Sequence, residues 1–249
     1  MTTQSTETKS SNTVMTAKQK MILALCAIVG VVVIVVTTVL GTVAYLTSSA
    51  AVSNVFTIGN VGITMTESKV DADGKKIPGA ERVDTNTYHL VPDKTYDKDP
   101  TIFVTEGSEA SYLFVLVRND LEAIADTTPG TTNKTIAQQL EEKGWARYTK
   151  GGTGWVYVYC GISGGVPTGD ATDLTVTPAT FAGTPEAVTG GTFVLFENFS
   201  IDPKADVSKY GAAKITLTAV AIQNTGFANI DEAWAAVVET YPYIHTGNN

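Results

Sequence analysis

Residues 41–67 read GTVAYLTSSAAVSNVFTIGNVGITMTE, and this stretch decides how the rest of the chain is organised. It joins the end of a long apolar run directly to a segment with the pattern of a β-strand, without a linker. Within residues 57–66, apolar residues alternate with polar residues or glycine, which predicts a half-buried strand. The apolar residues in this pattern are Ile58, Val61, Ile63 and Met65.

The apolar run covers residues 21–46 and contains no charged residue and no histidine. A run of this length can span a bilayer as a helix. Lys18 and Lys20 precede it, and such a positive flank stays on the cytoplasmic side, so everything after the run is expected to be exported. We expect residues 1–20 to form a disordered basic leader and residues 21–44 to form the hydrophobic helix of a signal peptide.

The end of the apolar run has the small residues that a signal peptidase reads. Thr42 and Ala44 occupy the two positions concerned, which predicts cleavage between Ala44 and Tyr45. Residues 45–57 would then become an extended N-terminal arm, and residues 58–249 a β-sandwich domain. In the alternative, the apolar run is retained and tethers the domain to the membrane.

The composition restricts the partners of the exported part. The chain has 249 residues with 17 basic and 25 acidic side chains; without residues 1–44, which hold three lysines and one glutamate, the net charge is −10. An acidic surface of this kind disfavours nucleic acid and anionic lipid. Cys26 lies in the apolar run, so Cys160 would be the one cysteine of the mature domain. The mature domain must therefore be stabilised by its hydrophobic core, without an intramolecular disulfide.

Several β-rich segments separated by glycine, proline and threonine runs follow residue 57. Two segments have helical spacing instead: residues 133–143, which Gly144 can end, and residues 229–240, which begin with Asn229 and Glu232 in a variant of the capping box. The pattern predicts a mostly β fold, a jelly-roll or Greek-key β-sandwich with two short helical insertions. The expected strands are residues 101–105, 111–118, 155–160, 192–199 and 214–222, the last with Ile215, Leu217, Ala219 and Ala221 on one face.

The sequence contains no recognisable catalytic constellation. His89 and His245 are far apart and have no partner ligands nearby, so neither predicts a zinc site. Cys160 is expected to be a small apolar side chain of its strand rather than a nucleophile. We therefore expect no enzymatic activity, no catalytic residue, no cofactor and no metal ligand set.

Two aspartate clusters raise the question of calcium. Residues 71–74 read DADG, but the glutamate that a calcium loop requires is absent at position 80, so a turn is expected there. Asp93, Asp97 and Asp99 lie close together in a loop, where a surface Ca²⁺ site is the one cation site that the sequence suggests.

Four motifs in this order resemble the TasA/camelysin family of secreted proteins of Gram-positive bacteria. The first is N-x-F-T-x-G-x-V-x-I, made by Asn54, Phe56, Thr57, Gly59, Val61 and Ile63. The others are residues 90–92 with 96–104 (LVP…YDKDPTIFV), residues 111–115 (SYLFV) and residues 215–223 (ITLTAVAIQ).

This resemblance implies a jelly-roll sandwich that a dedicated signal peptidase releases to the cell surface or matrix. In the TasA branch, subunits assemble into biofilm fibres, and the N-terminal segment adds as a strand to the neighbouring subunit. The matching segment here is residues 45–57, and head-to-tail addition of this kind generates open filaments. The residues expected to anchor the arm are Val52, Val55, Phe56 and Ile58.

The leading hypothesis is therefore a non-enzymatic subunit of extracellular biofilm-matrix fibres. Its expected partners are further copies of the same chain, a signal peptidase and other matrix proteins, with no nucleic acid and with contact to the membrane only before processing. Two alternatives stay open: a cell-surface metalloprotease of camelysin type, and a membrane-tethered adhesin or binding module.

Overall fold

The computed structural model describes residues 18, 21, 47–50, 52–128, 132–163, 166–169, 181–242 and 244, with side chains from residue 55 onward apart from 166–167. The chain divides into Met1–Tyr45 and a compact unit, Leu46–Asn249, to which every described strand belongs. The strands are β1 (Thr47–Ala50), β2 (Val52–Ile58), β3 (Ile63–Thr66), β4 (Thr87–His89), β5 (Thr95–Asp97), β6 (Thr101–Val104), β7 (Ser111–Asn119), β8 (Trp145–Gly151), β9 (Gly154–Tyr159), β10 (Ile162–Ser163), β11 (Val166–Pro167), β12 (Gly191–Val194), β13 (Asn198–Ser200) and β14 (Ile215–Gln223). The helices are α2 (Ile136–Glu142) and α3 (Ile230–Thr240), with 3-10 turns η1 (Glu122–Ile124) and η3 (Val207–Tyr210).

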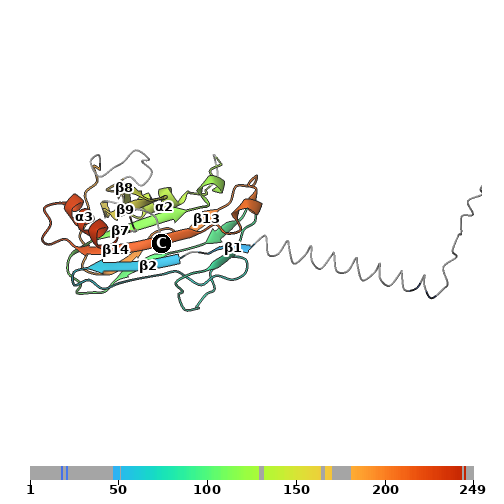
Figure 1. Ribbon diagram of the computed structural model, residues 1–249, viewed down its shortest axis with the longest axis horizontal. Coiled ribbons are helices and arrows are strands. Elements are labelled where there is room, and N and C mark those ends of the chain that lie inside the picture. The colour runs from blue at the N-terminus through green and yellow to red at the C-terminus, as the bar shows by residue number, and fades with distance from the viewer. Residues whose placement is uncertain are drawn as a thin grey trace, which may run out of the picture. The chain divides into compact units, whose positions relative to one another are not determined.

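The compact unit is built around a five-stranded sheet in the order β2-β14-β7-β9-β8 (Figure 1). A three-stranded sheet, β12-β6-β3, and the pairs β13-β5 and β1-β4 lie across from it. The expectation of a mostly β fold with two short helices is confirmed for the described residues.

The main core lies between these strand layers. The inward face of β14 carries Ile215, Leu217, Ala219 and Ala221, as the alternation in the sequence predicted. They pack with residues of β7 and with the three-stranded sheet, including Val115, Met65 and Ile102, all of which are buried. Strands with apolar residues at every second position can bury one whole face in this way.

A second core covers the opposite face of the five-stranded sheet. Here Phe114, Val220 and Ile222 pack against α3, whose buried residues are Ala233, Trp234 and Val237. The central strands β7 and β14 are therefore buried on both faces, which explains their nearly continuous apolar sequences.

Two of the expected strands are divided. Residues 57–66 are the end of β2 and the whole of β3, because the chain turns at Gly59 and crosses to the other strand layer. Residues 192–199 belong to β12 and β13, which pair with β6 and β5 respectively. The alternation changes phase between Ile58 and Val61, at the first break, whereas the apolar residues 193–196 run continuously up to the second break and do not mark it.

The helix ends follow the expected chemistry, with one shift. Asn229 caps α3 by accepting a hydrogen bond from the Glu232 amide at 3.0 Å. Helix α2 begins at Ile136, three residues after the expected start at residue 133, and is capped by Thr135 through a capping box with Gln138. Gly144 follows α2 with a φ of 83°, as expected of a glycine that ends a helix in the left-handed conformation.

The apolar run of residues 21–46 lies outside the described residues, apart from Met21, and so does the expected leader except for Lys18. Among the residues that are described, no helix is both long enough and apolar enough to cross a membrane.

A buried ion pair links Glu67, directly after β3, to Lys98, directly after β5. The Lys98 ammonium contacts the Glu67 carboxylate, and the two side chains are only 1% and 4% exposed. Burial lowers the pKa of Lys98, against the opposing effect of Glu67. The second carboxylate oxygen of Glu67 has no hydrogen-bond partner. Each charge in this pair therefore depends on the other.

We expect Lys98→Met alone to lower the free energy of unfolding by about 3–5 kcal/mol, because it leaves a carboxylate buried without a counter-ion. The double variant Lys98→Met with Glu67→Leu should recover most of that loss, because both charges are then removed. Urea denaturation of the two single variants and the double variant measures this. Additive losses in the double variant would contradict the account.

Candidate assembly edge and polar network

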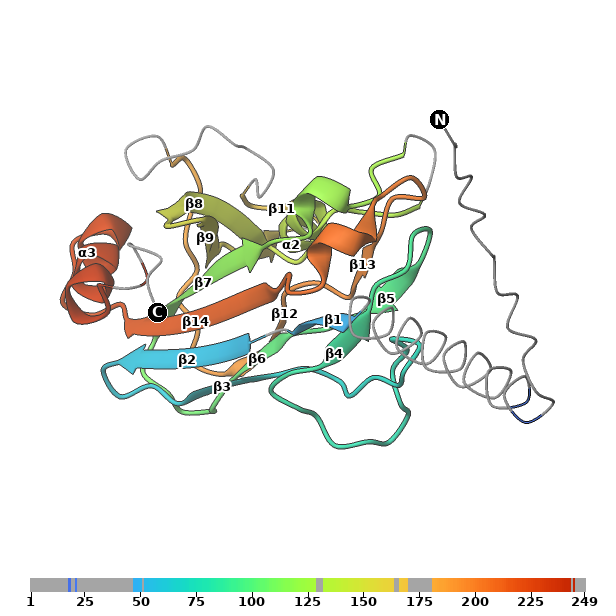
Figure 2. The ribbon, with the colours of Figure 1, turned by 45° about the vertical axis from the view of Figure 1, so that its right-hand side comes forward.

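Strand β2 forms one edge of the five-stranded sheet by pairing with β14 alone in that sheet (Figure 2). The two strands run parallel over seven residues, from the pair Val52–Thr216 to the pair Ile58–Ile222. Every other ladder between described strands is antiparallel. Parallel pairs are slightly less stable per residue than antiparallel pairs. Strand β2 is thus held in the sheet by the one parallel ladder among the described strands.

The anchor residues predicted from sequence lie on both faces of β2. Val55 packs against the core between the strand layers, whereas Phe56 and Ile58 pack against the core under α3. All three side chains are half-buried, as fits an edge strand. For Val52 the structure describes the backbone, which is paired with Thr216.

The segment after α3 holds β2 from the side opposite the main core. The Tyr241 ring lies 4.7 Å from the ring of Phe56, and its hydroxyl donates a hydrogen bond to the Thr57 carbonyl at 3.1 Å. No sequence pattern predicted this contact, because 184 residues separate the two groups. A lone tyrosine just after a helix has no local pattern that points to a strand partner.

Strand β14 would be exposed if β2 were absent. Residues Ala219–Ile222 of β14 are at most 1% exposed and lie opposite residues 55–58 of β2. Without β2, this strand would present unpaired N–H and C=O groups beside an apolar surface. Such an edge is a template for another strand.

The connection from β2 to β3 is short and contains Gly59, with a φ of 94°. A Cβ at this position would lie within 2.8 Å of Gln223 side-chain atoms, so glycine is required both by the backbone and by the close approach of β14. The turn at residues 59–62 therefore takes the chain from β2 in the five-stranded sheet to β3 in the three-stranded sheet.

The rest of the predicted arm is also paired within the chain. Strand β1 is antiparallel to β4, with Thr47 opposite His89 and Ala50 opposite Thr87. The proposed cleavage residues Thr42, Ala44 and Tyr45 lie outside the described residues. Release of the whole arm would thus break two ladders, β2–β14 and β1–β4.

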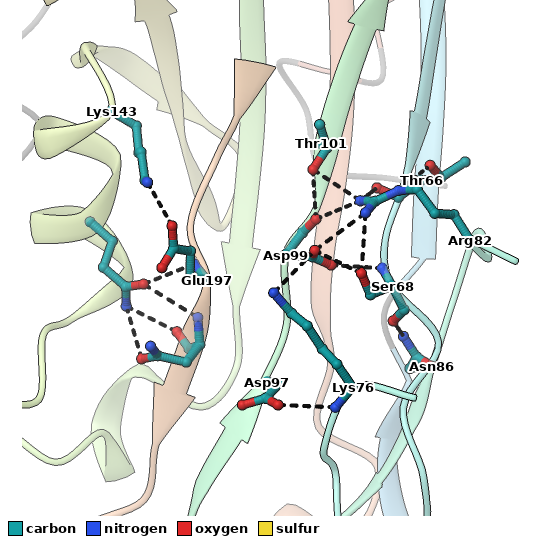
Figure 3. A network of polar contacts seen from close by, with 12 residues as sticks. Thr66, Ser68, Lys76, Arg82, Asn86, Asp97, Asp99, Thr101, Lys143 and Glu197 are labelled. Carbon is teal, nitrogen blue, oxygen red and sulfur yellow. Dashed lines mark hydrogen bonds and ion pairs between the residues drawn. The ribbon is translucent and has the colours of Figure 1, made fainter. Parts of the chain in front are cut away.

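A polar network joins the segment between β3 and β4 to the strands next to it (Figure 3). Asp99 is at its centre: its carboxylate accepts hydrogen bonds from the Ser68 amide at 2.6 Å and from the Ser68 hydroxyl at 2.8 Å. It also forms ion pairs with Lys76 at 3.2 Å and Arg82 at 3.3 Å. The Arg82 guanidinium donates in addition to the Thr66 and Asp99 carbonyls.

The groups around Asp99 keep its side chain in the ionised carboxylate form. Burial alone would raise the pKa of its carboxyl, but the hydrogen bonds from Ser68 and the charges of Arg82 and Lys76 outweigh it and hold the pKa below its ordinary value. Asp99 is therefore a carboxylate with a structural role at neutral pH.

Two of the three aspartates considered for Ca²⁺, Asp97 and Asp99, are engaged with cationic side chains, and Asp93 lies in a turn with a φ of 60°. Asp97 pairs with Lys75 at 3.3 Å and accepts from the Lys76 amide, while Asp99 is paired as described above. Asp71–Gly74 forms the expected turn, in which the Asp71 carboxylate accepts from the amides of Asp73 and Lys75. Within the described part of the chain, no three His, Cys, Asp or Glu side chains group as metal ligands. A surface Ca²⁺ site stays a prediction.

Neither His89 nor Cys160 lies in a catalytic arrangement. His89 is an exposed residue of β4, and His245 lies outside the described residues. Cys160 is 4% exposed, and burial, with a smaller effect of Glu186, raises the pKa of its thiol to about 12. Such a pKa disfavours the thiolate, which is the reactive form of cysteine. Cys160 packs in the core under α3 as a small apolar residue.

One pocket opens between η1, the start of α2 and β9. It has a volume of about 180 Å³, with Trp155 and Tyr157 on one wall. Asp126, Lys134 and Ser200 supply polar groups. Aromatic walls with a few polar groups are typical of small-molecule sites.

Comparisons with family models, with curated proteins and with solved structures found no match for this chain.

The polar network predicts an acid dependence of stability. A depressed Asp99 pKa contributes stability above its unfolded value of about 3.9, and this contribution is lost as the pH falls through the lower folded pKa. We expect Asp99→Asn to lower the free energy of unfolding at pH 7 by about 1–3 kcal/mol and to flatten its decrease below about pH 4. Urea denaturation between pH 2 and pH 7 measures both effects.

Asp73→Asn is the matched control, because Asp73 is 83% exposed and pairs only with Lys94 across the surface. It should leave the acid dependence unchanged. An Asp99→Asn protein with the same stability and the same pH profile as the parent would contradict the assigned role.

Proposed function

We propose that this protein is a structural, non-enzymatic subunit of extracellular biofilm-matrix fibres, which polymerises head-to-tail when β2 of one copy pairs with β14 of the next. The observation that carries the proposal is the position of β2. It is an edge strand near the start of the compact unit, and it covers an apolar strand that is otherwise fully buried. A strand of this kind can leave its sheet without breaking the order of the other four strands.

The exchange conserves the contacts that the single chain already makes. An incoming β2 would form the same seven-residue parallel ladder and bring Val55, Phe56 and Ile58 to the same two cores. Because β2 of each copy would pair with β14 of the next copy, the proposed contact is heterologous, and repeated addition that does not close gives a filament.

The remaining parts of the proposal rest on the sequence. Residues 1–44 act as a leader and signal peptide that is removed after Ala44, which exports the acidic domain to the cell surface or matrix. The four motifs shared with the TasA/camelysin family support a jelly-roll connection of the strands and assembly into biofilm fibres. The partners are then other copies of the chain, the signal peptidase and other matrix proteins.

The pocket beside Trp155 favours a second candidate function, that of a surface adhesin or binding module. Its volume of about 180 Å³ and its mixed lining suit one small ligand group. In this alternative β2 stays in its own sheet, and the protein acts as a single copy.

Electron microscopy of the chain without residues 1–44 tests the proposal. We expect filaments from this protein and none from a form that also lacks residues 45–57. Phe56→Asp should likewise abolish filaments, because a carboxylate would have to enter the core under α3. The other strands of the sheet should persist, with little change in the far-ultraviolet circular dichroism.

Phe103→Asp is the control, since Phe103 is a half-buried residue of β6, which pairs with β3 and β12 in the three-stranded sheet. It should form filaments as the parent does. Filaments from Phe56→Asp, or discrete particles from every protein tested, would refute strand exchange, and the second outcome would favour the adhesin.

A further inference from the structure

The site that holds β2 has two walls. One is the edge of β14, which supplies the backbone ladder. The other is the C-terminal segment, in which Tyr241 contacts both a side chain and a backbone carbonyl of β2, at Phe56 and Thr57. Together they form a groove that is occupied by the chain's own strand.

The second wall is firmly fixed to the sheet. The Trp234 ring of α3 lies 5.0 Å from the ring of Phe114 on β7, and the Tyr148 hydroxyl of β8 donates a hydrogen bond to the Asp231 carboxylate at 2.5 Å. Ile244, just beyond Tyr241, is 1% exposed and packs in the same core. These contacts come from strands other than β2, so the wall does not depend on β2 for its position.

The ladder with β14 does not by itself fix the register of β2. Backbone hydrogen bonds repeat every two residues along a strand, so a slip of two residues would restore the ladder and keep each side chain on its face. Such a slip would place Asn54 or Ile58 where Phe56 lies. An amide or an aliphatic side chain there could not reproduce the ring contact with Tyr241.

We propose that α3 and Tyr241 form an acceptor groove for β2 of a second copy of this chain, and that Tyr241 sets the register and selects the strand. This inference rests on the strand exchange proposed above. The groove recognises an aromatic ring at the Phe56 position together with the next carbonyl. An exported strand of similar hydrophobicity without that ring would be disfavoured, so the groove distinguishes copies of this chain from unrelated strands.

Hydrogen–deuterium exchange of the chain without residues 1–44 tests the role of Tyr241 before any assembly. We expect Tyr241→Ala to increase amide exchange in β2 by roughly tenfold or more, because it removes a ring contact and a hydrogen bond. Tyr241→Phe keeps the ring and should give a smaller increase, of roughly two- to tenfold. The amides of β7 should be unaffected in both.

Tyr210→Ala is the matched control, since Tyr210 is a half-buried tyrosine that packs on the other core. It should leave exchange in β2 unchanged. If β2 exchanges at the parental rate in Tyr241→Ala, or if Tyr210→Ala has the same effect, the proposal is wrong.

A peptide experiment tests selection. A fluorescent peptide of residues 47–60 is offered to the same protein, beside a peptide in which Phe56 is replaced by Leu. The parent should take up the first peptide roughly tenfold better than the second, and Tyr241→Ala should lose this preference. Equal uptake of both peptides by the parent would overturn the selective role.

Failure of both peptides to enter either protein would refute strand exchange and with it the groove's function in assembly. The exchange data on β2 would then still decide whether Tyr241 fixes the strand within a single copy. The two failures are therefore distinguishable.

Discussion

The parallel ladder between β2 and β14 is the interaction on which the organisation of this domain depends. Strand β14 is buried on both faces, and its pairing with β7 satisfies only one of its two edges. The other edge must be covered, because unpaired backbone groups beside an apolar surface are unfavourable in water and attract other strands. The chain meets this requirement with the residues that directly follow its apolar N-terminal run.

The strand that covers this edge is β2. It is anchored on both faces, by Val55 toward one core and by Phe56 and Ile58 toward the other, and Tyr241 holds it from outside the sheet. Yet it has one neighbour in its sheet, and its link to β3 is a four-residue turn that contains Gly59. These properties permit the same strand to serve its own domain or an adjacent one, which is the basis of the proposed fibre.

Local patterns in the sequence predicted much of the fold. The alternation in residues 214–222 identified the inward face of β14, and Asn229 with Glu232 identified the start of α3. The break between β12 and β13 was missed, because residues 193–196 form a continuous apolar run that does not show where the chain leaves one sheet for another. Strand β8 was missed as well, since its residues WARYTKG mix charged and aromatic side chains, and Arg147 is nevertheless buried against Trp155.

The candidate site was predictable only in part. The anchor residues of β2 followed from the sequence because they are consecutive and apolar. Their partners did not, since the contact of Tyr241 with Thr57 and that of Arg82 with Asp99 depend on how distant segments meet. Asp99 was predicted as part of a loop exposed to cations, whereas the fold surrounds it with Ser68, Lys76 and Arg82.

The most direct test of the central claim is solid-state NMR on assembled material made from two differently labelled populations of the chain. One population carries ¹⁵N and the other ¹³C, so that a signal between the two labels reports contacts between subunits alone. The account predicts such signals between residues of β2 and the residues of β14 that lie opposite them, including Thr57 with Ala221. If the mixed material gives no such signal, and Thr57 and Ala221 are in contact only within single subunits, then β2 stays in its own sheet. Strand exchange would be excluded by that result.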